Sequence, residues 1–281
     1  MPSLIAKALS TLRHEGPVGF AAKTLRKLRF WLEQARLPYV RTLALDDGET
    51  LQVYVNTPFS RQWYTAARAA SPEIVWIRQN LRPGHVVADV GANNGFTGVL
   101  FARAVGATGR VVGFEPSPAN LEAARENIRL NGIGNFELVA AAVGAVPATV
   151  SFDPGFGNGA VAAGGPIEVP QVTLDAHFGT SRVDLIKLDI EGYEFEALRG
   201  ARHLLGRHPA LAIEIHVALY TDCERQLAEL FDLLDLTAYD ASIQLDVDGP
   251  LAAFDPAVHT PRLIAQHANV HWLGVPKGRA G

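Results

Sequence analysis

The sequence predicts an α/β domain with a mostly parallel sheet that helices cover on both faces. From residue 85 onward, short apolar runs typical of buried strands alternate with stretches in which apolar residues recur at helical spacing. Glycine, proline and asparagine residues separate these segments. The 281 residues are 48% hydrophobic and 19% charged, a composition that can build a large buried core.

The first 40 residues are predicted to form a basic helical extension that is broken at Gly16-Pro17. Residues 1–41 hold eight Lys/Arg and two Asp/Glu, which leaves 17 basic and 27 acidic side chains for the rest of the chain. A basic helix of this kind can make peripheral contact with an acidic membrane surface or partner. We favour a cap helix with a solvated basic face, because such short patterns are common on ordinary surfaces.

Residues 41–80 are predicted to hold a β-hairpin and a helix that lead into the core. Residues 41–45 and 51–55 favour strands, and they flank Asp46-Asp47-Gly48-Glu49, a sequence typical of a hairpin turn. Ser71-Pro72-Glu73 is typical of a helix N-terminus, and we expect that helix to fill the rest of the segment.

The core domain is predicted to span residues 81–281, where strands and helices alternate. We expect strands at 85–90, 110–114, 136–143, 183–189 and 211–217, with late strands near 236–240 and 271–275. We expect helices at 97–105, 119–130, 194–205 and 224–234, a short helix from 173, and a glycine-rich loop at 153–166.

The turn after the first core strand carries the strongest local signal. Gly91 and Gly95 let the backbone bend sharply and approach a ligand, and the following helix offers free N–H groups at its N-terminus. Asp89 ends this strand. Glu115 ends the next one, where a carboxylate can accept both hydroxyls of an adenosine ribose.

The glycine spacing of this turn argues against a dinucleotide. The chain has Gly91-Ala92-Asn93-Asn94-Gly95 in place of the fingerprint Gly-x-Gly-x-x-Gly. An Asp two residues before the first glycine also suits a sulfonium cofactor better than a pyrophosphate, because two neighbouring anions repel each other. A nicotinamide-dependent oxidoreductase therefore stays as a minor alternative.

A second polar group follows two later strands. Lys187 and Asp189 share one face of the fourth strand, and Glu214 and His216 share one face of the fifth. If these strands are neighbours, the four side chains converge at the carboxyl edge of the sheet, where α/β proteins bind ligands. Because a lysine inside an apolar strand needs a partner, we predict that Lys187 pairs with Glu214.

Together these motifs resemble the FkbM-family methyltransferases over residues 80–218, and residues 269–273 show a weaker similarity. The matching positions are Asp89-Val90-Gly91-Ala92-Asn93-x-Gly95, Phe114-Glu115-Pro116, Asn127, Asn131, Val183-Asp184-Leu185-Ile186-Lys187-Leu188-Asp189-Ile190-Glu191-Gly192, Glu194, Leu198, Gly200 and Ile213-Glu214-Ile215-His216. The resemblance implies a Rossmann-like class I methyltransferase sheet of seven strands, the last of them antiparallel. It also implies methyl transfer from S-adenosylmethionine, usually to a hydroxyl of a sugar, a glycolipid or a natural product.

The cofactor site expected on this basis consists of the two turns and the residues beside them. The predicted cofactor-binding residues are Asp89, Gly91, Ala92, Asn93, Gly95, Glu115, Pro116, Asn120 and Ala142.

The polar group at the fourth and fifth strands is predicted to be catalytic, with Lys187, Asp189, Glu214 and His216 as its members. His216 is the first candidate for the general base because of its intrinsic pKa, and Asp189 is the next. Glu191 is expected to hold substrate hydroxyls. A structural Lys–Glu pair and a satisfied edge histidine remain the alternatives. Asp189, Glu191 and His216 could also bind a divalent cation, but their spacing does not demand one, and we predict no metal.

Bulk properties narrow the class of protein further. The net charge of −4 argues against nucleic acid as a partner, and the single cysteine, Cys223, favours a cytoplasmic protein without disulfides. No apolar run is long enough to span a membrane, and no secretory signal is evident. A binding or scaffold protein that keeps the fold without the chemistry remains the main alternative function. The sequence carries no signal of the oligomeric state.

Overall fold

The computed structural model describes residues 37–46, 48–155, 159–247 and 249–278. The predicted helices before residue 37, and the membrane contact assigned to them, lie outside the described residues. Within the described ranges, every helix is too short or too polar to cross a membrane.

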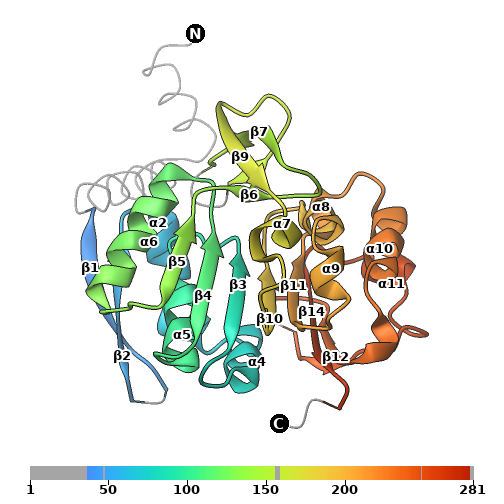
Figure 1. Ribbon diagram of the computed structural model, residues 1–281, viewed down its shortest axis with the longest axis horizontal. Coiled ribbons are helices and arrows are strands. Elements are labelled where there is room, and N and C mark those ends of the chain that lie inside the picture. Colours follow the sequence, from blue (N-terminus) through green and yellow to red (C-terminus); the bar gives the residue numbers. More distant parts are fainter. Residues whose placement is uncertain (1–36, 47, 156–158, 248, 279–281) are drawn as a thin grey trace, which may run out of the picture.

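A central sheet of eight strands organises the molecule, in the order β13-β12-β14-β11-β10-β3-β4-β5 (Figure 1). From the last of these to the first, the strands are β5 (Phe136–Val139), β4 (Arg110–Phe114), β3 (Val86–Val90), β10 (Leu185–Leu188), β11 (Ala210–Ile215), β14 (Val270–Pro276), β12 (Tyr239–Gln244) and β13 (Ala252–Ala253). The five strands from β5 to β11 are parallel, and β14 is antiparallel to both of its neighbours. The α/β fold class and the antiparallel last strand are confirmed, and the two-residue β13 adds an edge strand to the expected seven.

Helices cover both faces of this sheet, because the strand residues alternate between two hydrophobic clusters. On β3, Val87 belongs to one cluster and Ala88 to the other. The helices are α2 (Pro58–Trp63), α3 (Ala66–Ala69), α4 (Pro72–Asn80), α5 (Phe96–Val105), α6 (Pro118–Leu130), α7 (Leu174–Phe178), α8 (Glu194–Arg199), α9 (Arg202–Leu205), α10 (Cys223–Asp232) and α11 (Pro261–Ile264), with 3₁₀ turns η1 (Val217–Leu219) and η2 (Leu236–Ala238).

The predicted hairpin is present as β1 (Tyr39–Ala44) and β2 (Thr50–Val55), paired antiparallel. Asn127 of α6 and Asn131, the residue that follows this helix, fasten the hairpin to the core. The backbone N–H of Tyr54 donates to Oδ1 of Asn127 at 2.6 Å, and that of Gln52 donates to Oδ1 of Asn131 at 3.0 Å. The hairpin therefore shares one body with the sheet, and it lies along the outer side of α6 in Figure 1.

A second, smaller sheet was not expected from the sequence. It has the order β6-β9-β7-β8 and lies beyond the carboxyl ends of the central strands (Figure 1). Its strands are β6 (Ala142–Val143), β7 (Ala148–Asp153), β8 (Ala160–Val161) and β9 (Ile167–Val172). The single strand predicted at 136–143 is wrong, because a tight turn in which Ala141 N donates to Val139 O divides it between the two sheets.

Two other elements differ from the prediction by more than one or two residues at their ends. The helix expected at 194–205 is two helices, α8 and α9, separated at Gly200. A Cβ at Gly200 would collide with the carbonyl oxygen of Gly144, so glycine permits this close backbone approach between the helix end and the segment after β6. The late strand expected near 236–240 begins at Tyr239, because the residues before it form η2.

Candidate active site

The turn between β3 and α5 has the backbone that its glycines predict. Gly91 and Gly95 have φ angles of 84° and 74°, in the left-handed region that favours glycine. A Cβ at Gly91 would collide with the carbonyl oxygen of Asp189, so the turn presses against the end of β10. The N–H groups of Gly91 and Ala92 both donate to the carbonyl oxygen of Phe114 at 3.0 Å, which fixes the turn beside the end of β4.

Glu115 is buried at the end of β4 and links the two turns. Its Oε2 accepts the N–H of Asn93 at 2.9 Å, its Oε1 accepts the N–H of Ser117 at 2.7 Å, and the Asn120 side chain also hydrogen-bonds it. Burial raises the pKa of Glu115 to about 7, and these donors oppose the rise. A carboxylate held in this way keeps free lone pairs for two further donors, as the ribose of an adenosine requires.

Asp89 and Lys187 form the buried part of the site, and here one prediction is wrong. Lys187 does not pair with Glu214. Its Nζ lies 3.1 Å from Oδ2 of Asp189 and 3.8 Å from Oδ1 of Asp89. The register explains the difference, because Lys187 lies opposite Asp89 on β3 and opposite Ala212 on β11, two residues before Glu214.

The charge of Lys187 is stabilised by these acids. Burial alone would lower its pKa, but the carboxylates of Asp189 and Asp89 raise it above its usual value. Burial also raises the pKa of Asp89 to about 6. Asp89 Oδ2 accepts a hydrogen bond from Thr97 at 3.3 Å, whereas its buried Oδ1 has no hydrogen-bond partner among the described residues.

Glu214 pairs with histidine instead of lysine. Its Oε2 lies 3.3 Å from Nε2 of His271 on β14, directly opposite it in the sheet, and its Oε1 accepts from Asn269 at 3.3 Å. Although burial opposes the change, the hydrogen bond and charge of His271 lower the pKa of Glu214.

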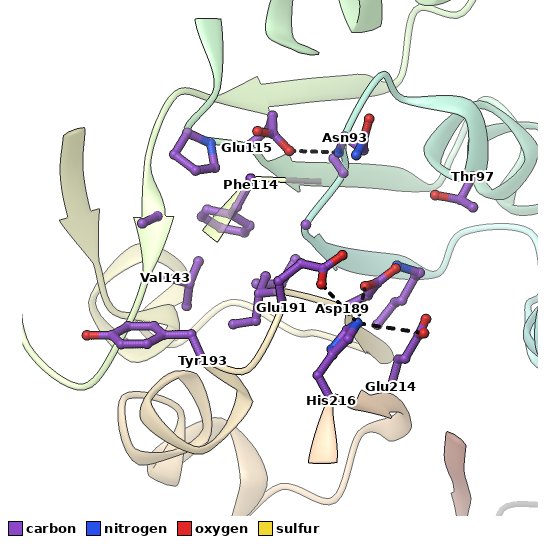
Figure 2. A pocket seen from close by; sticks show the side chains of 18 of the residues that line it. Asn93, Thr97, Phe114, Glu115, Val143, Asp189, Glu191, Tyr193, Glu214 and His216 are labelled. Atoms are coloured by element: carbon purple, nitrogen blue, oxygen red, sulfur yellow. Dashed lines mark hydrogen bonds and ion pairs between the residues drawn. The ribbon is translucent and has the colours of Figure 1, made fainter. Parts of the chain in front are cut away.

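His216, at the end of β11, faces acidic groups on both sides of its ring. Its Nδ1 lies 2.8 Å from Oε1 of Glu194 on α8. Its Nε2 lies 3.5 Å from Oε2 of Glu191, 3.7 Å from Oε1 of Glu214 and 3.8 Å from Oδ1 of Asp189. Figure 2 shows these three side chains converging on the ring. We refer to Asp189, Glu191, Glu214 and His216 as the acidic cluster.

The setting of His216 changes the role expected of it. Burial lowers its pKa, but the hydrogen bond and charge of Glu194, with help from Asp189, raise the pKa to about 10. The ring is therefore a cation at neutral pH in the structure as it stands, and its intrinsic pKa no longer supports the role of general base. The role of general base for Asp189, the second candidate, stays a prediction. Glu191 has a φ of 53°, an uncommon backbone conformation for a glutamate that is often found at functional sites.

A cavity of about 450 Å³ joins the two parts of the site. Figure 2 shows Asn93 and Glu115 at one end and the acidic cluster at the other. The predicted residues that line the cavity are Gly91, Ala92, Asn93, Glu115, Pro116, Ala142, Lys187, Asp189, Glu191, Glu214 and His216. Asp89, Gly95 and Asn120 lie behind this lining: Asp89 supports Lys187, Gly95 starts α5, and Asn120 supports Glu115.

Several lining residues were not expected from the sequence. Phe59, Trp63 and Tyr64 come from α2 and the residue after it, while Phe152 and Val161 come from the small sheet. His271 of β14 also lines the cavity. Glu194 was named above only as a position that matches the FkbM family, and no role in the site was expected of it. No sequence signal places α2 at the site.

The site fits the cofactor that the resemblance implies. The Glu115 carboxylate is held by backbone donors and lines the cavity, and Gly91, Ala92 and Asn93 of the turn line it as well. Asp89 lies behind the cavity lining, and Nζ of Lys187, 3.8 Å from its Oδ1, supplies the positive charge beside it.

Known proteins that are similar to this chain include methyltransferases. A solved structure of an FkbM methyltransferase from Methylobacillus flagellatus aligns with 19% identity and a TM-score of 0.46, over 69% of this chain and 44% of its own. A solved S-adenosylmethionine-dependent O-methyltransferase from Thermotoga maritima aligns with 14% identity and a TM-score of 0.45, over 86% and 79%. An arsenite methyltransferase from Halobacterium salinarum is 36% identical over 67 residues, 24% of this chain and 17% of that protein.

The chain thus spans less than half of the FkbM structure and under a fifth of the arsenite methyltransferase. The family model named methyltransferase FkbM domain matches residues 89–241, which is more than half of the 281 residues. Its match begins at Asp89 and includes both Glu115 and the acidic cluster. The chain belongs to the FkbM methyltransferase domain family, whose cofactor is S-adenosylmethionine.

Proposed function

We propose that this chain transfers a methyl group from S-adenosylmethionine to a hydroxyl oxygen of a sugar, a glycolipid or a natural-product small molecule. The observation that carries the proposal is the single cavity that Glu115 and the acidic cluster line together. One part is suited to an adenosine ribose, and the other offers several oxygen and nitrogen atoms to a hydroxylated acceptor. The family membership supports the donor, and the polar chemistry of the cluster supports the acceptor class.

The chain's own residues hold the reactants and remove a proton. When bound, S-adenosylmethionine supplies an electrophilic methyl group. Glu115 and the turn at Gly91 hold its adenosine end, while the acidic cluster holds the acceptor hydroxyl. Positioning supplies most of the acceleration, because alignment of two bound reactants is worth about 7–11 kcal/mol. A carboxylate of the cluster, with Asp189 as our candidate, would take the hydroxyl proton as the C–O bond forms and the methyl–sulfur bond breaks, leaving S-adenosylhomocysteine.

The aromatic wall of α2 supports an acceptor that carries both apolar and hydroxylated surface. Phe59, Trp63 and Tyr64 line the same cavity as the acidic cluster, and Trp63 is 43% exposed. Aromatic rings pack against the apolar faces of sugars and polyketides, while the cluster offers partners to their hydroxyls. We expect acceptors of this mixed kind to bind better than fully polar ones.

The test is an acceptor screen with two readouts. The protein is incubated with S-adenosylmethionine and hydroxylated acceptors, each paired with its amino analogue. S-adenosylhomocysteine formation and the mass of the methylated product are both measured. We expect turnover with hydroxyl acceptors, and a loss of at least about a hundredfold in Asp189→Asn, which is the low end for a removed proton acceptor. Glu196→Gln, which changes an acid that pairs with Arg199 on α8 outside the cavity lining, should keep the wild-type rate.

Two results would contradict the proposal. Methylation of the amino analogues alone would move the reaction to nitrogen. Binding of S-adenosylmethionine without turnover of any acceptor would favour the scaffold alternative.

A further inference from the structure

We propose that the acidic cluster is a binding site for one first-row divalent cation, with Mn²⁺ as the best match. The ligands are Nε2 of His216 and carboxylate oxygens of Asp189, Glu214 and Glu191.

The spacing of the ligand atoms supports one shared ion. One ligand atom each from Asp189, Glu214 and His216 lies within 4.8 Å of the other two, and Oε2 of Glu191 lies 3.5 Å from Nε2 of His216. A first-row ion lies about 2.0–2.2 Å from its ligands, so two ligand atoms lie at most about 4.4 Å apart. The Nε2 separations of 3.5–3.8 Å satisfy this limit.

The His216 ring supplies an independent observation. Its side chain is only 5% exposed, and in the described part of the chain Nε2 makes no hydrogen bond, although three carboxylate oxygens surround it. The other ring nitrogen lies 2.8 Å from the buried Glu194, which also accepts from Gly192 N and from the hydroxyl of Tyr220. A histidine that binds a metal usually donates its second ring nitrogen to a carboxylate in this way. The ring is thus oriented with Nε2 toward the other acids.

The donor set favours manganese over the commonest alternatives. Ca²⁺ and Mg²⁺ prefer oxygen ligands alone, and structural zinc sites are usually built from cysteine and histidine. One imidazole with two or three carboxylates suits Mn²⁺ or a similar first-row ion. The cluster also lines the cavity, with Asp189 and Glu191 each 24% exposed, so an ion can enter and keep a position for substrate.

A second acidic group nearby is not open to the cavity in the same way. Glu73, Glu214 and His271 also lie close together, but Glu73 is fully buried and Arg68 supplies its counter-charge at 3.0 Å. Glu73 is also absent from the cavity lining, so an ion that enters the cavity does not reach all three residues. In the acidic cluster, by contrast, all four residues line the cavity.

The role of the ion rests on the proposed function. A cation at the cluster would bind the acceptor hydroxyl and lower its pKa, so that a cluster carboxylate can take the proton. The acceptor would then present an oxygen pair, such as a vicinal diol, that can occupy two positions on the ion.

The binding test uses the full chain and does not depend on turnover. Protein treated with EDTA and dialysed is titrated with MnCl₂, and free Mn²⁺ is followed by its six-line EPR signal. We expect one Mn²⁺ per chain. Asp189→Asn and His216→Ala should each weaken Mn²⁺ binding by more than about a hundredfold, and Glu194→Gln, a change in a positioning residue, by about 10–100-fold.

Glu115→Gln is the matched control, because it changes a buried acid at the other end of the same cavity. It should bind Mn²⁺ as the wild type does while losing affinity for S-adenosylmethionine. Each cluster variant is checked for folding by its binding of S-adenosylmethionine. The proposal fails if the wild type does not bind Mn²⁺ at millimolar concentration, or if folded Asp189→Asn and His216→Ala bind it with wild-type affinity. Turnover without Mn²⁺ binding would overturn this proposal alone and leave the methyl transfer standing.

Discussion

At the scale of single residues, Glu115 shows how burial and donors together prepare a carboxylate for a ligand. Its pKa of about 7 lies above the usual value because the side chain is buried, and its two backbone donors limit the rise. A raised pKa means that this group favours the folded state most below its unfolded pKa. That contribution is lost as the pH rises through about 7, where the buried group must ionise.

The affinity for the cofactor should depend on pH in the opposite direction to this stability contribution, rising as the pH rises. The ionised Glu115 is the better acceptor for ribose hydroxyls, so we expect the affinity for S-adenosylhomocysteine to fall by up to about tenfold per unit as the pH drops below 7. Isothermal titration calorimetry between pH 5.5 and 8.5 measures this. Glu115→Gln should bind weakly and lose the dependence. A wild-type affinity that stays constant over this range would show that the carboxylate does not bind the cofactor.

Lys187 illustrates a second residue-scale effect, the dependence of a buried charge on its partners. We expect Lys187→Met to lower the free energy of unfolding by about 3–5 kcal/mol, because Asp89 would be left as an uncompensated buried acid. Urea denaturation measures the change. Lys277→Met replaces an exposed lysine in the same way and should have little effect. If Lys187→Met proves as stable as the wild type, Asp89 does not depend on the lysine charge.

At the scale of elements, Asn127 on α6 joins three segments. Its side chain is buried, with 1% of its surface exposed. Its Oδ1 accepts from the N–H of Tyr54 on β2 at 2.6 Å, and its Nδ2 donates to the carbonyl oxygen of Asn94, in the turn between β3 and α5, at 2.7 Å. Asn131, one helical turn later, also holds β2, but none of its hydrogen bonds reaches the turn. A comparison of the two residues therefore distinguishes attachment of the hairpin, which both provide, from support of the turn, which Asn127 provides and Asn131 does not.

This difference can be measured with two alanine variants. Asn127→Ala should lower the free energy of unfolding by about 1–3 kcal/mol, because it leaves buried backbone groups without partners, and it should also weaken cofactor binding. Asn131→Ala should destabilise the protein without changing cofactor affinity. Chemical denaturation and calorimetry give the two quantities. Equal cofactor affinities in both variants would mean that Asn127 does not support the turn.

The same scale explains what the sequence could predict. Strong local patterns placed β3, β4, α5, α6 and the turn at Gly91, because buried strands and glycine turns are set by nearby residues. The pairing of Lys187 was not predictable, because it depends on the register between β10 and its neighbours. The small sheet was missed for a similar reason, since β8 is two residues long and pairs only with β7.

At the scale of the whole molecule, the cavity is assembled from segments far apart in the sequence. The central sheet supplies Glu115 and the acidic cluster, α2 supplies the aromatic wall, and the small sheet supplies Phe152 and Val161. The aromatic wall could not be predicted, because nothing in residues 58–64 indicates that they reach a site built from residues beyond 89. The sequence thus predicted the polar residues at the ends of the central strands but not the aromatic wall of the cavity.

The hairpin and the central sheet should unfold as one cooperative unit. Leu51 of β2 is 1% exposed and belongs to the same hydrophobic cluster as Val87 of β3 and Leu273 of β14. Leu51→Ala should therefore cost about 2–5 kcal/mol, with a single transition that far-UV circular dichroism and tryptophan fluorescence report together. Val40→Ala, on the exposed side of β1, should change the stability by less than about 0.5 kcal/mol.

S-adenosylhomocysteine should raise the midpoint of the same transition that Leu51→Ala lowers, because a ligand stabilises the unit that binds it. Two transitions, of which only the one unaffected by Leu51→Ala responds to the ligand, would instead make the hairpin a separate unit.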